Sequence, residues 1–175
     1  MISRKNIIDL LDVFNELHNK MDNVELVLLG DGDSRVSLEQ HTQTLESKDD
    51  IHFLGYRDDR LDYLKSFDLF VMTSTLEGIP RCLMEACAME TPVAAYDIAG
   101  IDQLITHEST GLLAPLGDKA ALLLAWEKIL QDDDYARQLG KNACDYVNEH
   151  YSAKRMADEY TTLFNELLDN KDVSR

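Results

Sequence analysis

A segment near the middle of the chain, residues 74–85, has residue types suited to binding a phosphate. We expect a helix to begin at Pro80, because proline is well tolerated at the first helical position, where its missing N–H is not needed. The backbone N–H groups of the next three residues, Arg81, Cys82 and Leu83, would then lack acceptors inside the helix. Together with the positive end of the helix dipole, such groups favour an anion. The pattern therefore predicts a phosphate site at this helix start.

Three charged side chains of the same segment extend this prediction to a nucleotide sugar. Arg81 can add a charge-assisted contact to a phosphate. Glu85, one turn further along, can accept the two hydroxyls of a ribose, and Glu77 in the preceding turn can face a second polar part of the ligand. A plainer interpretation stays open, because Arg81 and Glu85 at i, i+4 can form a surface ion pair worth ~0.5 kcal/mol. Likewise, residues 77–80 can be an ordinary polar turn.

The elements that would position this segment alternate between strand and helix. Strands are predicted at residues 24–29, 51–54, 69–72, 92–96 and 112–113. Helices are predicted from Ile7 to Met21 with Ser3 as N-cap, at 34–47, 61–67, 80–89 and 101–105, and from Asp118, Asp134 and Ser152. This alternation indicates one α/β domain with a Rossmann-like parallel sheet and helices on both faces. Ligands of such sheets bind at the carboxyl ends of the strands.

Composition and charge exclude several classes of protein. The 175 residues include 33 acidic and 17 basic side chains, a formal net charge of −16. Such a charge argues against nucleic acid as a partner and against electrostatic adsorption to an anionic membrane. No apolar run approaches ~18 residues, the length needed to span a bilayer. The three cysteines form no C-x-x-C motif, and no histidine cluster has zinc-ligand spacing, so we expect reduced thiols, a cytoplasmic location and no metal site.

Six segments, in order, carry a resemblance to a known family. They are Val24–Asp33, Ile51–Tyr56, Asp68–Pro80, Glu85–Ala88, Pro92–Ala95 and Gly111–Asp118. Glu77 and Glu85, with seven residues between them, match a paired-glutamate motif. As an ordered set, these segments resemble the retaining GT-B glycosyltransferases of glycosyltransferase family 4, also called group 1, over nearly the whole chain.

The resemblance implies a role for each matching residue. The domain would be the C-terminal, donor-binding half of a GT-B enzyme, whose donor is a nucleotide-diphosphate sugar. By resemblance, Glu85 would bind the ribose, and Glu77 would bind sugar hydroxyls and hold the donor for catalysis. The amides after Gly78, beginning with that of Ile79, would cradle the diphosphate. The reaction would be sugar transfer to a glycan or lipid, with retention at the anomeric carbon.

Two further positions match the family outside this segment. Lys5 matches its phosphate-binding lysine, although a lysine in the first turn of a helix is more simply a solvated side chain. Gly55, Tyr56 and Arg57 match a loop that meets the base, largely through backbone groups. By resemblance, Lys5, Arg81 and the helix start would stabilise the leaving diphosphate without cofactor or obligatory metal.

The sequence also departs from the family pattern. Glu90 stands where a glycine usually follows the second-glutamate helix, so we expect another way out of that helix. Ala99-Gly100 replaces a Gly-Gly pair, and Gln103 stands where glutamate is common, which puts the fine positioning of the donor in doubt.

Parts of the family's enzymes have no counterpart in this sequence. The family's upstream strand is absent, so the sheet would lack its first, central strand and leave 24–29 and 69–72 each with an unpaired edge. The N-terminal acceptor-binding domain, through which the intact enzyme could meet a membrane, is absent too. We therefore expect a domain at 1–150, a helix at 151–168 that would pack toward that domain, a polar tail at 169–175, and no activity of the chain alone.

Two other functions remain open at this stage. A nucleotide-sugar epimerase has a related fold that also binds nucleotide diphosphates, although the ordered motifs disfavour it. A non-catalytic nucleotide-binding or flavodoxin-like module is the third alternative. Titration with nucleoside diphosphates would separate the first two functions from the third.

Overall fold

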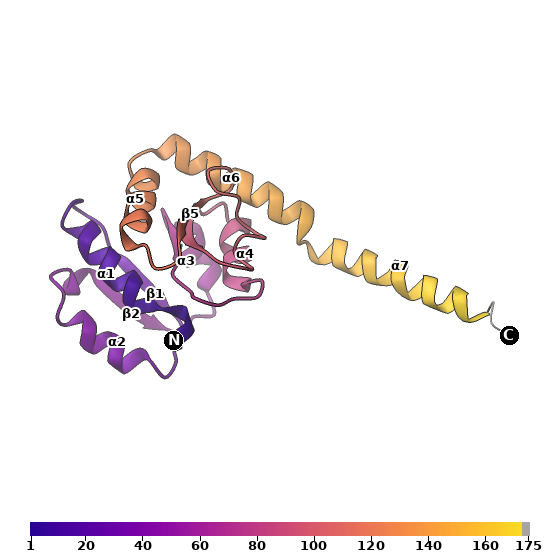
Figure 1. Cartoon of the computed structure of the whole chain (residues 1–175), viewed down its shortest axis with the longest axis horizontal. Helices are drawn as coiled ribbons and strands as arrows, with labels where there is room; N and C mark the ends of the chain where they lie inside the picture. The colour runs from indigo at the N-terminus through magenta and orange to yellow at the C-terminus, as the bar shows by residue number, and fades with distance from the viewer. Residues whose placement is uncertain (173–175) are drawn as a thin grey trace.

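The computed structural model of the protein describes residues 1–172, with side chains as far as Leu168. Parallel strands flanked by helices confirm the predicted α/β class (Figure 1). The strands are β1 (Leu26–Leu29), β2 (Ile51–Gly55), β3 (Phe70–Met72), β4 (Val93–Asp97) and β5 (Leu112–Pro115). The helices are α1 (Ile7–His18), α2 (Arg35–Thr42), α3 (Arg60–Ser66), α4 (Arg81–Ala88), α5 (Lys119–Leu130), α6 (Asp133–His150) and α7 (Ala153–Asp172), with short 3-10 turns at Ser3–Lys5 and Lys48–Asp50.

The strands form two separate parallel sheets. β1 pairs with β2, with Leu26 opposite Ile51. β4 lies between β3 and β5, with Phe70 opposite Val93 and Ala94 opposite Leu112. Within residues 1–172, β1 and β3 each pair on one side only. The unpaired edges predicted for these two strands are therefore observed, and both strands line one cavity of about 790 Å³.

Helices cover both faces of the sheets, as β4 shows most clearly. Its Ala94 and Tyr96 belong to a core shared with α1 and α5, whereas Val93 and Ala95 belong to a second core shared with α4 and α6. All four side chains are fully buried. Because successive strand residues point to opposite faces, this alternation places helices on the two sides of β4.

Two predicted helices differ from the observed ones. Residues 101–105 form turns instead of a helix, yet Ile101, Leu104 and Ile105 are almost completely buried. The Leu104 and Ile105 amides both donate to the Ile101 carbonyl, at 2.9 Å, so one turn with helical hydrogen bonds buries this side without continuing into a helix. The helix predicted at 34–47 is shortened to α2, which buries only Leu38 and Thr42.

The last helix extends away from the body of the molecule (Figure 1). α7 continues past the predicted end at Leu168, into the segment expected to be a polar tail, while residues 173–175 lie outside the described residues. The Oγ of Ser152 accepts a hydrogen bond from the Arg155 amide, as expected of an N-cap. The apolar stripe of α7 is exposed along its length, at Met156, Tyr160, Leu163 and Phe164 among others.

The exit from α4 corrects the expectation raised by Glu90. Glu90 has a φ of +60° and takes the left-handed conformation that a glycine would take. The Glu90 amide donates to the Cys87 carbonyl, and the Thr91 amide donates to the Ala86 carbonyl. This pair of bonds is the Schellman ending, so the chain leaves the helix in the usual way, with a glutamate in the glycine position.

Glu90→Gly is therefore expected to raise the free energy of unfolding by about 1 kcal/mol, because a Cβ makes this conformation unfavourable. Glu90→Ala, which keeps a Cβ, is the matched control and should bring no gain. Urea denaturation of the three proteins measures the difference. Equal stabilities of the glycine and alanine variants would show that the left-handed backbone carries no strain.

Candidate active site

The predicted site residues come from the N-terminal turn and from the carboxyl ends of β2 and β3. The loop after β3 carries Glu77 and leads into α4, and the turn Ser3–Lys5 crosses beside it. The Arg4 carbonyl accepts a hydrogen bond of 2.8 Å from the Thr75 amide, which fixes the two segments side by side. This location is where an open parallel sheet binds its ligands.

The start of α4 differs by one residue from the prediction. The helix begins at Arg81, and Pro80 is the N-cap with extended backbone. The Leu83 amide is not free, because it donates to the Pro80 carbonyl at 3.1 Å. Among the described residues, no backbone acceptor faces the amides of Gly78, Ile79, Arg81 and Cys82. These four N–H groups, at the positive end of the helix, are the donors that an anion can use.

The turn at Glu77 and Gly78 rests on Gly100. A Cβ added to Gly100 would lie 1.7 Å from the Gly78 carbonyl oxygen, and the φ of Gly100 is +92°. Both the contact and the conformation require glycine at this position. The close contact with Gly100 therefore fixes the position of the turn that carries the Gly78 and Ile79 amides.

Glu77 and Lys5, 72 residues apart in sequence, form an ion pair. The Lys5 Nζ lies 2.6 Å from the Glu77 Oε1, and the side chains are 30% and 8% exposed. Partial burial is the largest single influence on the Glu77 carboxylate and opposes its ionisation. The hydrogen bond and positive charge of Lys5, together with the contributions of other neighbours, outweigh burial and lower the pKa of Glu77. The two residues assigned to catalysis by resemblance are thus brought together, with Lys5 in a 3-10 turn and not in the first turn of α1.

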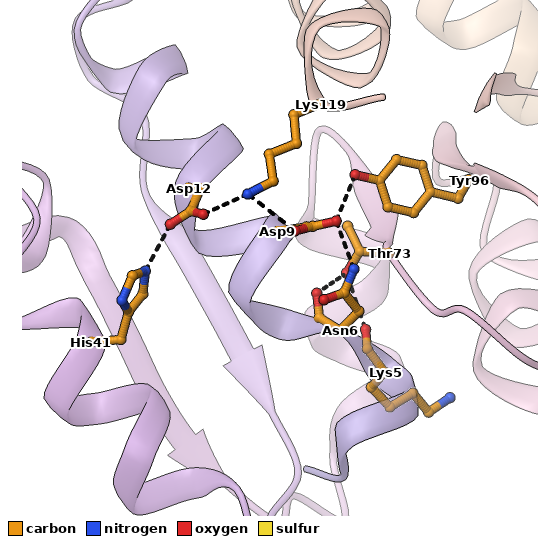
Figure 2. A network of polar contacts seen from close by, with 8 residues as sticks. All are labelled: Lys5, Asn6, Asp9, Asp12, His41, Thr73, Tyr96 and Lys119. Carbon is orange, nitrogen blue, oxygen red and sulfur yellow. Dashed lines mark hydrogen bonds and ion pairs between the residues drawn. The ribbon is translucent and has the colours of Figure 1, made fainter. Parts of the chain in front are cut away.

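A network of polar contacts holds the backbone around Lys5 (Figure 2). The Thr73 hydroxyl lies within hydrogen-bond distance of the Lys5 and Asn6 carbonyls, at 3.1 and 2.9 Å. Asn6, the N-cap of α1 in place of the expected Ser3, is left-handed with a φ of +47°. Its side-chain amide donates to the Asp9 carboxylate at 2.6 Å. Contacts with Thr73, after β3, and with Asp9 of α1 therefore fix the backbone from which the Lys5 side chain extends.

Asp9 connects this network to α5 and β4 (Figure 2). It accepts from the Tyr96 hydroxyl at 3.0 Å and pairs with Lys119 at 3.1 Å. Lys119 also pairs with Asp12, which contacts His41 of α2 at 2.7 Å. Burial, and then the bond to Asp9, raise the pKa of Tyr96, so its hydroxyl remains a donor. Sequence reasoning missed this network, whose one local signal was two carboxylates at i, i+3 in the mostly apolar first half of α1.

Glu85 is held by two arginines. Arg60, at the start of α3, contacts both carboxylate oxygens of Glu85, at 2.8 and 3.0 Å, and Arg81 donates to one of them at 2.8 Å. The hydrogen bond from Arg60 is the main cause that lowers the pKa of Glu85. Partial burial acts in the opposite direction, and the hydrogen bond from Arg81 lowers the pKa further. The ion pair foreseen between Arg81 and Glu85 is present, whereas Arg60 was not predicted.

The loop after β2 lines the same cavity as Glu85 and Lys5. Tyr56 is 74% exposed. The Arg57 guanidinium makes two hydrogen bonds to Asp59, at 2.7 and 2.9 Å, and lies over the Tyr63 ring. The Arg57 side chain is therefore held by Asp59 of its own loop and forms an ion pair with neither Glu77 nor Glu85.

Cys82 also lines the cavity, at the start of α4. A helix start can lower the pKa of a thiol. Here burial is the main influence and raises the pKa of the Cys82 thiol, despite its place at a helix start. A neutral, half-buried thiol suits a packing role.

Comparisons with known proteins identify the family of the sequence. The sequence model of the family "Glycosyl transferases group 1" matches residues 1–145. N-acetyl-alpha-D-glucosaminyl L-malate synthase from Bacillus anthracis is 28% identical over 164 residues, covering 94% of this chain and 43% of that protein.

Solved structures share the fold as well. Sucrose-phosphate synthase from Thermosynechococcus elongatus superposes with a TM-score of 0.87 at 29% identity, over 97% of this chain and 44% of its own. HepE from Anabaena, solved in complex with UDP-glucose, gives a TM-score of 0.87 at 22% identity. This match covers 95% of the present chain and 46% of the HepE chain.

The chain spans a little under half the length of these relatives. Within residues 1–172, every helix is too short or too polar to cross a lipid bilayer. The family match extends over most of the sequence, from the turn that carries Lys5 to α6. The fold, the paired glutamates and this match lead to one conclusion: the chain belongs to the glycosyl transferases group 1 family and has the GT-B type of α/β fold.

Proposed function

We propose that this domain binds the nucleotide-diphosphate sugar donor of a retaining glycosyltransferase of family 4, as the C-terminal half of the enzyme. The observation that carries the proposal is the arrangement around the start of α4. Four amides without a backbone acceptor lie there among the described residues, between the Lys5–Glu77 pair and the Glu85 carboxylate. This order of anion donors and hydroxyl acceptors fits a sugar linked through a diphosphate to a ribose.

Each group then has a role in the transfer. The amides from Gly78 to Cys82 and the Lys5 ammonium bind the diphosphate. Arg81, whose side chain is 78% exposed, turns from Glu85 to the diphosphate. Glu85 then keeps its two bonds to Arg60 and has two lone-pair sites with which to accept ribose hydroxyls. Glu77 accepts sugar hydroxyls and orients the anomeric carbon. The bond from that carbon to the diphosphate oxygen breaks as an acceptor hydroxyl attacks from the same face. The proton of the hydroxyl passes to the departing diphosphate oxygen. Lys5, Arg81 and the helix start stabilise the departing nucleoside diphosphate, without an obligatory metal.

The second half of the reaction needs groups that we place outside this chain. We propose that an acceptor-binding domain supplies them and closes over the donor to exclude water. The isolated chain would then bind a donor weakly and transfer no sugar. The length of the relatives supports this division, and the UDP-glucose bound to HepE supports a uridine nucleotide as the first donor to test. The acceptor would be a glycan or a lipid, used in the cytoplasm or at the membrane surface.

The test compares variants of the two glutamates by calorimetry with UDP. Glu85→Ala should weaken UDP binding by about 10- to 150-fold, the effect of losing a charged hydrogen-bond acceptor of about 1.5–3 kcal/mol. Glu77→Gln should change UDP binding little, because UDP carries no sugar. Glu108→Ala removes a carboxylate from an exposed ion pair with Lys128 and serves as the control.

Two results would contradict the assigned roles. Equal weakening by Glu77→Gln and Glu85→Ala would show that Glu77 contacts the nucleotide. Unchanged binding in both variants would leave the glutamates with structural roles only, a polar turn and a set of surface ion pairs. Circular dichroism of each variant checks that the fold is intact.

A further inference from the structure

Arg60 holds Glu85 through two parallel hydrogen bonds. The Arg60 Nη2 lies 2.8 Å from the Glu85 Oε1, and the Arg60 Nε lies 3.0 Å from the Oε2. Because one rigid guanidinium holds both oxygens, a pair of this kind fixes the plane of the carboxylate as well as its position. The last torsion of a glutamate side chain is otherwise broadly distributed. Arg60 therefore determines the direction in which the remaining lone pairs of Glu85 point.

The two arginines that contact Glu85 differ in their freedom to move. The Arg60 side chain is 35% exposed, less than half the exposure of the Arg81 side chain. Arg81 holds only one of the carboxylate oxygens, from one turn earlier in the same helix. An exposed i, i+4 pair of this kind is weak, so it is easily exchanged for a contact with a ligand. Arg60 is thus the partner that we expect to stay with Glu85 when a nucleotide binds.

Helix α3, which begins at Arg60, is fixed against α4. Leu64 is buried in the core that also contains Leu83 of α4. The Thr91 hydroxyl, just after α4, donates to the Leu64 carbonyl at 2.6 Å. Because both contacts join α3 to the end and the face of α4, the Arg60 side chain starts from backbone whose position relative to Glu85 is set. Arg60 therefore has the geometry of a positioning residue.

The bonds from Arg60 leave Glu85 with room for two donors. Both residues line the cavity beside the start of α4. The Arg60 bond is the main cause that lowers the pKa of Glu85, so at neutral pH the carboxylate only accepts hydrogen bonds. A carboxylate has about four lone-pair sites, of which Arg60 uses one on each oxygen. The remaining sites match the two vicinal hydroxyls of a ribose, whereas a 2′-deoxyribose offers one hydroxyl fewer.

We propose that Arg60 is a positioning residue that makes this site selective for ribonucleotides over their 2′-deoxy counterparts. Arg60 acts through Glu85 and not by contact with the nucleotide. Two simultaneous bonds to a diol require one orientation of the carboxylate, whereas a single bond is compatible with many. Fixing the orientation in advance therefore favours the diol most. This inference rests on the proposed function, in which Glu85 accepts ribose hydroxyls, and adds the residue that determines the class of nucleotide.

The test compares UDP with 2′-deoxy-UDP by NMR titration of the full chain, which follows dissociation constants into the millimolar range. The parent chain should bind UDP about 10- to 150-fold more tightly, the effect of one hydrogen bond to a charged acceptor. Arg60→Ala should lower this ratio about tenfold, toward equality, because the second bond then has to order the carboxylate. Lys65→Ala removes a positive charge from an exposed position of the same helix and should keep the parental ratio.

Arg60→Lys separates orientation from charge. Lysine keeps a positive charge beside Glu85 but cannot form the two parallel bonds. This variant should bind UDP more tightly than Arg60→Ala does, while its ratio stays as low. A parental ratio in either Arg60 variant would overturn the proposal. Tighter UDP binding by Arg60→Ala than by the parent would also overturn it, because Arg60 would then compete with the ribose for Glu85.

Glu85→Ala distinguishes failure of this inference from failure of the proposed function. It should bring the ratio close to equality, and adding Arg60→Ala should change the ratio no further. A parental ratio in Glu85→Ala, or a parent chain that does not discriminate, would refute the ribose role of Glu85 and this inference with it. If Glu85→Ala loses the ratio and Arg60→Ala keeps it, only the inference fails. The amide spectra show whether each variant is folded, and Arg60→Lys carries the comparison if Arg60→Ala is not.

Discussion

Gly100→Ala is expected to abolish measurable UDP binding and to lower the free energy of unfolding by about 2–5 kcal/mol. Two costs add at this position. The φ of +92° disfavours any residue with a Cβ, and the new Cβ would lie 1.7 Å from the Gly78 carbonyl oxygen. That oxygen belongs to backbone, so the turn must move. The displaced turn is the one that presents the Gly78 and Ile79 amides and carries Glu77.

Gly117→Ala is the matched control for this variant. Gly117 has a φ of +81°, but nothing lies within 4 Å of its added Cβ. This variant should lose about 1–2 kcal/mol from backbone strain alone and bind UDP normally. Chemical denaturation and calorimetry measure both effects. If the two variants lose the same stability and both bind UDP, the contact between Gly100 and the turn does not control the site.

Gly140→Ala is expected to destabilise the protein by about 3 kcal/mol, although alanine is the better helix former by about 1 kcal/mol. Gly140 lies in α6, where an added Cβ would come 2.1 Å from the Glu90 carbonyl oxygen. Glu90 is fixed in its left-handed conformation at the end of α4, so backbone must shift on one side of the contact. The movement would separate α4 from α6 and disturb the core that holds Leu83 and Ala143.

Lys141→Ala, at the next and exposed position of α6, provides the control. It changes helix propensity only slightly and touches no backbone, so its midpoint in urea should stay close to that of the parent chain. A Gly140→Ala variant as stable as Lys141→Ala would mean that α6 can move away from Glu90 without loss.

The strands and the covered faces of the sheets could be predicted because they follow from local patterns. Runs such as Val93–Tyr96 are apolar on both faces, which is typical of a strand covered by helices on two sides. The predicted start of α4 was one residue too early, since the fixed φ of proline suits an N-cap and a first helical position alike. The turn at 101–105, buried on one side, imitates helical spacing, and no local pattern distinguishes the two.

The site was predictable only where a motif marks it. Glu77 and Glu85 stand at a fixed spacing, and Lys5 was found through the family resemblance. Arg60 could not be foreseen, because its partner Glu85 is 25 residues away and only the packing of α3 on α4 brings them together. The contacts of Asp9 with Tyr96 and Lys119 join segments up to about 110 residues apart, so they depend on the completed fold.

The first residues of the chain join two loops and also carry Lys5. The Met1 carbonyl accepts from Ser34 in the loop after β1, and the Arg4 carbonyl accepts from Thr75 in the loop after β3. A nucleotide held by Lys5 would therefore bind only where both loops are folded. Mass action then requires that the nucleotide stabilise the native state, by about 2.7 kcal/mol at a concentration of about 100 Kd.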